Sequence, residues 1–397
     1  MINWGFFYLE RMKNIFSTTE MLSKLIAFDT TSSKSNKPMI DFISEFLNRH
    51  NITCNLGSNQ EETKGDLLAT IGPMVEGGIV LSGHTDVVPV DGQDWDSNPF
   101  TLTKKNKMLF GRGTCDMKGF IAVVLSLIPE IQALNLKVPL HLAFSYDEEL
   151  GCLGAPGLIA RLIQDIPMPM GAIIGEPTGM KLVIAHKGGS SYETEVTGYP
   201  GHSSQTQAGV NAISVAAECI MFLNSKANAF KTEGTLDERM VPPYNTINIG
   251  TIDGGTARNI IAGSCRFVWG CRRITDRDLN ELIEQFSDHC ENEILPSHLK
   301  ISRDVKITTR KIHSLPPLLH DDDNPVEAIV RQLTGQNQMT GVSFGTEAGM
   351  YSEAGIPSVV YGPGYIDQAH KPNEYVSITQ LEECSRFIRK LAKWASK

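Results

Sequence analysis

The chain has 397 residues, of which 41% are hydrophobic and 20% are charged, and its formal net charge at pH 7 is -9. This length exceeds what one hydrophobic core usually serves, so we expect two domains, and the composition is that of an ordinary globular protein. Because acidic residues are in excess, no basic face is expected. We therefore expect that the protein does not bind nucleic acid.

The first 14 residues, MINWGFFYLERMKN, begin with an apolar patch that is interrupted by Glu10 and Arg11. The segment lacks a positively charged start and a complete apolar stretch, so we expect no signal peptide, and Met12 is an alternative start. No apolar run of the sequence approaches the roughly 18 residues of a membrane span, so no membrane partner is expected.

The cysteines indicate a reducing compartment. They are spread along the chain without CxxC pairing, at Cys54, Cys115, Cys152, Cys219, Cys265, Cys271, Cys290 and Cys384. A chain of this length does not need disulfides to fold, so we expect reduced thiols and a cytoplasmic location.

The first predicted helix follows Ser17, because Ser17 and Glu20 form a capping box before an amphipathic stretch through Leu25. Strands and helices then alternate, and a long helix of small and apolar residues is predicted over 116–134. This alternation predicts an α/β fold with a doubly wound, mainly parallel sheet. Three apolar runs predicted as strands of this sheet lie at 78–82, 141–145 and 171–175.

The pattern changes after residue 187, where a polar, alternating strand begins. The predicted order is strand, helix, two strands, helix and strand, over 191–196, 210–223, 246–250, 265–272, 276–293 and 305–309. That order is a ferredoxin-like α+β unit, which can stand as a domain of its own. We therefore predict an inserted domain over 188–312, between the two parts of the first domain, 1–187 and 313–397.

Five short stretches carry acids or histidines that could bind metal: LSGHTDVVP (81–89), GRGTCDMKG (111–119), SYDEELG (145–151), IIGEPTG (173–179) and QAHKP (368–372). The candidate ligands are His84, Asp116, Glu148, Glu149, Glu176 and His370. A single buried histidine or aspartate is more often a hydrogen-bonded structural residue. These candidates, however, follow or interrupt apolar runs and precede Gly or Pro, which places them at the carboxyl ends of strands, where α/β sheets build their sites.

Together these stretches resemble the M20-type metallopeptidase and deacylase family, which includes aminoacylases and carboxypeptidases of the glutamate type. The resemblance covers nearly the whole chain. Within the family it is most similar to the acetylornithine deacetylases, in DEELGCLGA (147–155), PPYNTINIGTIDGGTARNI (242–260) and GPGYIDQAHKPNEY (362–375). The resemblance implies a catalytic domain with an inserted domain that serves as a lid and for dimerisation.

The resemblance also implies two divalent metal ions, Zn²⁺ or Co²⁺, which accept histidine nitrogen and carboxylate oxygen. It assigns Asp116 as the bridging ligand, with a cis peptide bond after it. His84 and Glu176 then complete one metal, and Glu149 and His370 complete the other. Metal supply in the cell, rather than the ligand set, decides between the two ions.

Two further acids have predicted roles beside the metals. Glu148 and Glu149 are neighbours that point in opposite directions in an extended segment, so only one of them is expected to bind metal. In the family pattern Glu148 is the general base, which takes a proton from water and delivers it to the leaving amine. Asp86 lies on the same side of the chain as His84 and is expected to orient its imidazole. The alternative for Asp86 is an acid that caps a turn.

His202, in the sequence GHSS, belongs to the predicted inserted domain. The resemblance implies that this histidine reaches the active site of the partner subunit in a homodimer and stabilises the tetrahedral oxyanion. The alternative is a histidine at a strand end that is hydrogen-bonded to Ser203 or Ser204.

Four residues are candidates for binding the substrate. By resemblance, Asn259 and Arg272 contact the substrate carboxylate, and arginine offers the planar fork that suits it, although Arg273 is adjacent. Thr346 and Glu347 precede a predicted helix and could present backbone donors and one carboxylate. Glu347 is the candidate partner of a substrate side-chain ammonium group.

The expected reaction is the hydrolysis of N-acetyl-L-ornithine to acetate and L-ornithine by a two-metal amidohydrolase, a step of arginine biosynthesis. A small-molecule N-acyl amino acid is the expected partner, and N-acetylcitrulline and N-succinyl-diaminopimelate are alternative substrates. From another class, the alternative is a catalytically silent binding relative, which the intact ligand set argues against. The segment GVSFG (341–345) matches the GxSxG motif of serine hydrolases, but the polar residues before it do not predict the strand that the motif requires.

Overall fold

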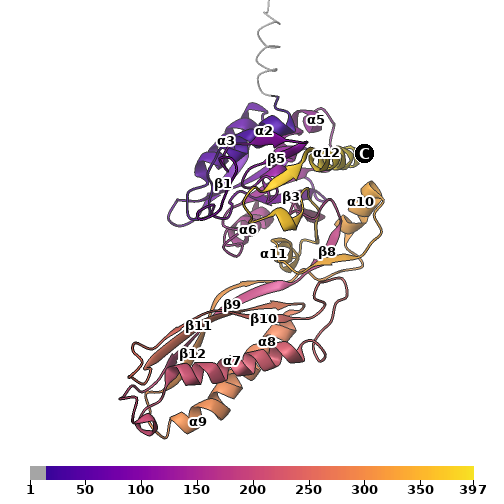
Figure 1. The fold of residues 1–397 in the computed structure, drawn as a ribbon. Helices are drawn as coiled ribbons and strands as arrows, with labels where there is room; N and C mark the ends of the chain where they lie inside the picture. Colours follow the sequence, from indigo (N-terminus) through magenta and orange to yellow (C-terminus); the bar gives the residue numbers. More distant parts are fainter. Residues whose placement is uncertain (1–14) are drawn as a thin grey trace, which may run out of the picture. The chain divides into compact units, whose positions relative to one another are not determined.

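The computed structural model describes residues 15–397, which divide into two compact units (Figure 1). The first unit contains the described residues up to Ile184, together with His320–Thr340 and Thr346–Lys397. The second contains Ala185–Leu319 and Gly341–Gly345. Residues 1–14, to which our predictions about a signal peptide and an alternative start apply, lie outside the described residues.

The large sheet has eight strands in the order β1-β2-β6-β3-β7-β14-β8-β13. Along the chain they are β1 (Cys54–Ser58), β2 (Gly65–Ile71), β3 (Ile79–His84), β6 (Leu140–Ser145), β7 (Gly171–Ile174), β8 (Val183–His186), β13 (Thr340–Val342) and β14 (Ser358–Val360). The central strands β6, β3, β7 and β14 are parallel, whereas β1, β2 and β8 pair in antiparallel fashion. This mainly parallel core of the sheet confirms the predicted α/β class.

The residues of β3, β6 and β7 are all buried, as expected for parallel strands that are covered by helices. The helices of the first unit are α2 (Thr18–Ile26), α3 (Lys37–Arg49), α4 (Lys118–Ser126), α5 (Ile128–Gln132), α6 (Ala155–Asp165), α10 (Pro325–Thr334), α11 (Ala348–Glu353) and α12 (Ile378–Ala395). Among the described residues, no helix combines the length and apolar character that crossing a membrane requires.

One predicted helix start agrees with the structure, and one predicted helix is interrupted in it. The capping box of Ser17 and Glu20 is present at the start of α2, as predicted. The single helix predicted over 116–134 is wrong, because α4 ends at Ser126 and α5 begins at Ile128. Pro129 lies in the first turn of α5, where its missing N–H costs nothing, whereas inside a continuous helix it would break the hydrogen-bond ladder.

A small sheet in the first unit ties the C-terminal segment to the loop that precedes α4. Its order is β15-β5-β4, with β4 at Thr103–Lys105, β5 at Met108–Phe110 and β15 at Tyr375–Ser377. Tyr375 is opposite Phe110 in this antiparallel pairing. The small sheet therefore brings together two segments that each lead to a predicted metal ligand, Asp116 and His370.

The second unit has the predicted strand and helix order. Its four strands form the antiparallel order β10-β11-β9-β12, and both long helices cover the same face of this sheet (Figure 1). The elements are β9 (Gly188–Thr197), α7 (Ala212–Ala229), β10 (Thr246–Gly254), β11 (Ser264–Arg273), α8 (Asp276–His289) and β12 (Lys306–Leu315). After α8 the chain continues through a π-helical turn at Cys290–Ile294 into α9 (Leu295–His298). We predicted an insertion over 188–312, and this unit runs from Ala185 to Leu319 and also takes in Gly341–Gly345.

The second unit has a hydrophobic core of its own. The inward side chains of β9 and β11, among them Phe267 and Trp269, pack against α7 and α8. Alternate residues of β11 are buried, which is the pattern of a sheet that is covered on one face.

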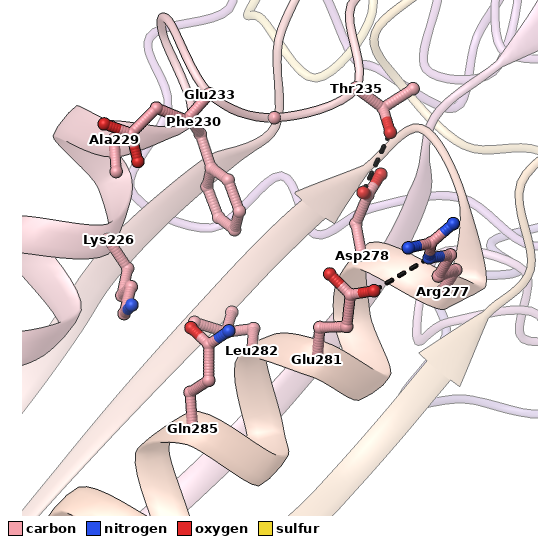
Figure 2. Close-up of a pocket in the computed structure, with 11 residues that line it drawn as sticks. Lys226, Ala229, Phe230, Glu233, Thr235, Arg277, Asp278, Glu281, Leu282 and Gln285 are labelled. Carbon is pink, nitrogen blue, oxygen red and sulfur yellow. Dashed lines mark hydrogen bonds and ion pairs between the residues drawn. The ribbon is translucent and has the colours of Figure 1, made fainter.

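The second unit has a hollow of about 430 Å³ between the end of α7 and α8. Figure 2 shows the side chains that line it. Two of its acids already have partners: Asp278 accepts a hydrogen bond from Thr235 at 2.9 Å, and Glu281 accepts one from Arg277 at 2.7 Å. No histidine or cysteine is among the described residues that line it.

Candidate metal centre and active site

Three of the predicted metal ligands, His84, Glu149 and Glu176, lie where strands of the large sheet end. His84 is the last residue of β3, and Glu176 follows β7 by two residues. Glu149 lies in the turn after β6, and Asp116 lies in the loop before α4. Because β3, β6 and β7 are parallel, their carboxyl ends meet at one edge, where sheets of this class place their sites.

Asp116 lies between the two predicted histidine ligands. Its Oδ1 is 3.0 Å from Nε2 of His84, and its Oδ2 is 3.3 Å from Nε2 of His370. Nε2 of His84 is also 3.6 Å from Oε1 of Glu176, and Nε2 of His370 is 3.0 Å from Oε2 of Glu149. The structure thus brings all five predicted ligands together, with Asp116 presenting one oxygen to each side.

The peptide bond between Asp116 and Met117 is cis, which confirms the prediction made from the resemblance. His370 also has an unusual backbone conformation, because its φ of 63° is in the left-handed region. Its side chain is 53% exposed, whereas the side chains of the other four predicted ligands are almost entirely buried.

The protonation of these side chains shows how strongly they interact. Burial raises the pKa of Glu176 well above its ordinary value, and the charge of Asp116 adds to the rise. Burial and the charge of Asp116 also raise the pKa of Glu149. Burial acts on Asp116 as well, but hydrogen bonds from His370 and His84 outweigh it and lower the pKa of this acid. Hydrogen bonds to Asp116 and Glu149 in turn raise the pKa of His370 to about 10.

Such a set of donors fits divalent cations. Buried carboxylates that lie this close repel one another, and positive charge between them relieves the repulsion. The ligand atoms of His84, Asp116 and Glu149 all lie within 4.8 Å of one another, and so do those of His84, Glu148 and Glu176. Histidine nitrogens and carboxylate oxygens are the ligands that Zn²⁺ accepts.

Glu148 and Glu149 lie on different sides of this cluster, Glu149 beside His370 and Glu148 within reach of His84 and Glu176. Oε1 of Glu148 accepts a hydrogen bond from the Cys152 thiol at 3.2 Å. Burial raises the pKa of Glu148 to about 8, and the charges of neighbouring acids add to the effect. A carboxyl group that holds a proton near neutral pH is suited to exchange it.

Asp86 has more contacts than the sequence predicted. Its Oδ1 is 3.5 Å from Nδ1 of His84, but its own backbone oxygen is closer to that nitrogen, at 3.0 Å. The carboxylate also accepts the backbone N–H groups of Glu148 and Glu149, at 3.1 and 3.3 Å, and the Ser32 hydroxyl at 2.7 Å. Asp86 therefore orients the imidazole of His84 mainly through its backbone, and its side chain holds the turn of the two glutamates.

Of the predicted substrate-binding residues, Thr346 and Glu347 belong to the first unit and are buried. The carboxylate of Glu347 accepts a hydrogen bond from the Ser82 hydroxyl at 3.2 Å and another from the Ser145 hydroxyl. Ser82 and Ser145 are on β3 and β6, so Glu347 lies beside the strand ends that carry the ligands.

His202, Asn259 and Arg272 belong to the second unit, where all three are exposed. Nδ1 of His202 is 2.8 Å from the Ser204 hydroxyl. Ser203 donates its backbone N–H to the backbone oxygen of Asn259 at 3.1 Å, so the segments that carry His202 and Asn259 are neighbours. Arg272 lines a separate hollow of about 270 Å³ on β11.

The GxSxG match does not form a nucleophile elbow. β13 ends at Val342, and α11 does not begin until Ala348. The hydroxyl of Ser343 donates to the backbone oxygen of Val241 at 2.6 Å. The strand-to-helix turn that a serine nucleophile requires is therefore missing at this position.

The family profile described as Peptidase family M20/M25/M40 matches residues 80–394, which include every predicted metal ligand. The chain belongs to this family. It is 33% identical over 387 residues to the acetylornithine deacetylase of Proteus mirabilis, covering 97% of this chain and 95% of the relative. It is 34% identical over 374 residues to the acetylornithine deacetylase of Myxococcus xanthus, covering 92% and 94% of the two chains.

Among solved structures, the M20 family metallo-carboxypeptidase Sso-CP2 from Sulfolobus solfataricus has a similar fold, with a TM-score of 0.73 and 18% identity. The alignment covers 96% of this M20 chain and all of the carboxypeptidase. The family and its fold make this chain a metal-dependent hydrolase of amide bonds.

Three residues without a predicted role in the site, Ser32, Cys152 and Glu374, contact Asp86, Glu148 and the backbone of Asp116, respectively. Cys152 and Glu374 are within motifs that were recognised, DEELGCLGA and GPGYIDQAHKPNEY. Their positions in those motifs were the only indication in the sequence that they belong to the site. A contact with a backbone N–H group cannot be predicted from residue types.

Proposed function

We propose that this M20 chain is a two-metal deacetylase that converts N-acetyl-L-ornithine to L-ornithine and acetate. The observation that carries the proposal is the arrangement of Asp116 between His84 and His370, with the half-buried Glu148 and the buried Glu347 beside it. The similarity to acetylornithine deacetylases supports the choice of substrate.

In this proposal His84, Asp116 and Glu176 hold one Zn²⁺ or Co²⁺, and Asp116, Glu149 and His370 hold the other. When bound, two such cations acidify water and polarise the amide carbonyl. Glu148 takes a proton from the attacking water and delivers it to the leaving nitrogen, which needs a carboxyl group whose pKa is above the ordinary value. The raised pKa of Glu148 has burial as its main cause and agrees with this role.

The charge of the site favours a substrate with a cationic side chain. Five carboxylates gather near the strand ends: Asp116, Glu148, Glu149, Glu176 and Glu347. When all are ionised, they carry more negative charge than two divalent cations neutralise. An ornithine side chain with its ammonium group supplies the missing positive charge, whereas a succinyl group adds negative charge.

A substrate panel tests this choice. N-acetyl-L-ornithine should have a kcat/KM at least about tenfold above that of N-acetyl-L-citrulline, because a lost charge-assisted hydrogen bond costs about 1.5 kcal/mol or more. Glu347→Gln keeps the size of the side chain but removes its charge, so it should reduce this preference while activity on the citrulline compound is largely retained. Equal kcat/KM values for the two compounds in the wild type would contradict the role of Glu347.

Removal of metal tests the class of function. A chelator should abolish the activity, and Zn²⁺ or Co²⁺ should restore it, because both sites consist only of histidine and carboxylate ligands. The rate and the metal content are measured on the same samples, and chelator saturated beforehand with Zn²⁺ serves as the control. Full turnover by a preparation shown to be free of metal would contradict the mechanism, and a metal-bound protein inactive on every N-acyl amino acid would favour a silent relative.

The proposal includes a cytoplasmic homodimer in which the second unit serves as a lid and each chain lends His202 to its partner. Ser204 engages Nδ1 of His202, which orients the ring and leaves Nε2 to donate a hydrogen bond to a substrate oxygen. Asn259, adjacent to His202, and Arg272 are the proposed partners of the substrate carboxylate.

A further inference from the structure

Glu374 is a buried acid whose carboxylate collects four hydrogen bonds. Oε1 accepts the backbone N–H groups of Cys115 and Asp116, at 2.8 and 3.1 Å. Oε2 accepts the backbone N–H of Gly113 at 3.0 Å and Nη1 of Arg112 at 2.8 Å. The whole carboxylate is therefore used to hold one short stretch of backbone, the stretch that ends at the predicted bridging ligand.

Arg112, the ionic partner of Glu374, is also fully buried and reaches a third segment. Its guanidinium donates to the backbone oxygen of Lys371 at 3.3 Å and to Oε1 of Gln93 at 2.6 Å. It also lies over the ring of Trp95, at 5.1 Å from the ring centre. Arg112 thus contacts the residue next to His370 as well as Glu374.

Backbone contacts reinforce the same junction. Gly111 donates its N–H to the backbone oxygen of Glu374 at 3.0 Å, next to the pairing of β5 with β15. Gln93 also donates to the backbone oxygen of His370, at 3.0 Å. The loop that leads to Asp116 and the loop that carries His370 are therefore joined by Glu374, Arg112 and Gln93.

His370 needs such support more than the other predicted ligands. Its side chain is half-exposed and its backbone is in the left-handed region, so neither surrounding packing nor a regular element holds it in place. Asp116, at 7% side-chain exposure, is enclosed by its neighbours. The separation of these two ligands depends on how their loops are joined.

A buried ion pair is an inefficient way to gain stability, because the cost of removing two charges from water often cancels their attraction. A carboxylate that accepts several backbone N–H groups instead specifies geometry, since each bond has a defined direction. Partners of metal ligands that do not themselves touch the metal commonly tune its affinity in this way.

We propose that Glu374, together with Arg112, is a positioning residue of the metal centre, which holds Asp116 and His370 at the separation that lets both bind the same cation. This inference rests on the two-metal site of the proposed function. It assigns Glu374 no contact with substrate or with the reacting atoms. Its loss should weaken chiefly the cation shared by Asp116, Glu149 and His370, and should spare the one on the His84 side.

The test measures how many zinc ions each protein binds and how tightly, instead of its activity. Glu374→Gln and Glu374→Ala are compared with the wild type and with Glu382→Gln, which alters an exposed acid of α12. Each metal-free protein is titrated with Zn²⁺ against a chromophoric chelator, bound zinc is counted after gel filtration, and the Tm of the metal-free protein is recorded. The glutamine in Glu374→Gln turns an N–H₂ group toward backbone donors, so it breaks at least one side of the carboxylate clamp.

The wild type and Glu382→Gln should retain two zinc ions per chain. The Glu374 variants should bind the first with near-normal affinity and the second about 10- to 100-fold more weakly. Arg112→Lys keeps the charge beside Glu374 but loses the fork that reaches Lys371 and Gln93, so it should show a smaller loss in the same direction. If the Glu374 variants fail to fold, the number and affinity of the zinc ions bound by Arg112→Lys test the inference instead.

Two normal zinc affinities in folded Glu374 and Arg112 variants would overturn the inference, even if their Tm fell, because the residues would then stabilise the fold alone. A wild type that binds fewer than two zinc ions would instead contradict the proposed metal centre itself. Failure of the inference is therefore seen as normal zinc binding by the variants, and failure of the proposed metal centre is seen as fewer than two bound zinc ions in the wild type.

Discussion

Glu148→Ala should lower kcat by at least about 10²-fold while two metal ions stay bound, because the change removes the proton shuttle and leaves the five predicted ligands in place. The residue is suited to that role by its burial, which raises its pKa to about 8, and by its position beside His84 and Glu176. A steady-state assay gives kcat, and metal analysis of the same protein gives the number of ions retained.

The neighbouring change, Glu149→Ala, is the matched comparison for this prediction. Oε2 of Glu149 is 3.0 Å from Nε2 of His370, so its loss should remove one cation together with the activity. Added Zn²⁺ should therefore restore part of the activity of Glu149→Ala but none of that of Glu148→Ala. If metal is lost from Glu148→Ala and kept by Glu149→Ala, the roles of ligand and base are interchanged.

The fold was predictable where local pattern and burial agree. The capping box at Ser17 and the fully buried strands β3, β6 and β7 are set by side chains that follow one another in the sequence. The helix predicted over 116–134 failed because nearly every residue of α4 is buried, so the apolar run has no polar face whose interruption would mark its end. Pro129 was the only local sign of the break.

Some residues of the candidate site could likewise be predicted from the sequence, and others could not. His84, Glu149 and Glu176 could be predicted as a group because each ends or follows a strand, and the topology of a parallel sheet brings such positions together. Asp116 lies in the loop before α4, so its place in the group came from the family resemblance. Glu374 could not, because three of its four hydrogen-bond donors are backbone N–H groups, which every residue except proline offers equally. The role of His202 in a partner's site depends on a contact between two chains, so it follows neither from a local pattern nor from the fold of one chain.

Complementation between two inactive variants should reveal whether active sites are shared. Glu148→Ala and His202→Ala should each be nearly inactive as homodimers, because one loses the proton shuttle and the other loses the oxyanion partner. When equal amounts are mixed and allowed to exchange, about half of the dimers should be heterodimers. In each heterodimer one site has Glu148 from its own chain and His202 from the partner, so activity should recover to roughly a quarter of that of the wild type.

This recovery separates the proposed role of His202 from the local one. Its hydrogen bond to Ser204 is compatible with both, because a ring held at Nδ1 can either complete a partner's site or only cap its own loop. Mixing Glu148→Ala with Glu149→Ala is the control that should show no recovery, since every site then lacks either the general base or a metal ligand, whichever chains combine. Mass spectrometry confirms that heterodimers have formed. If they have formed and the first mixture stays as inactive as its parents, His202 acts within its own chain, and the lid of one subunit does not complete the site of the other.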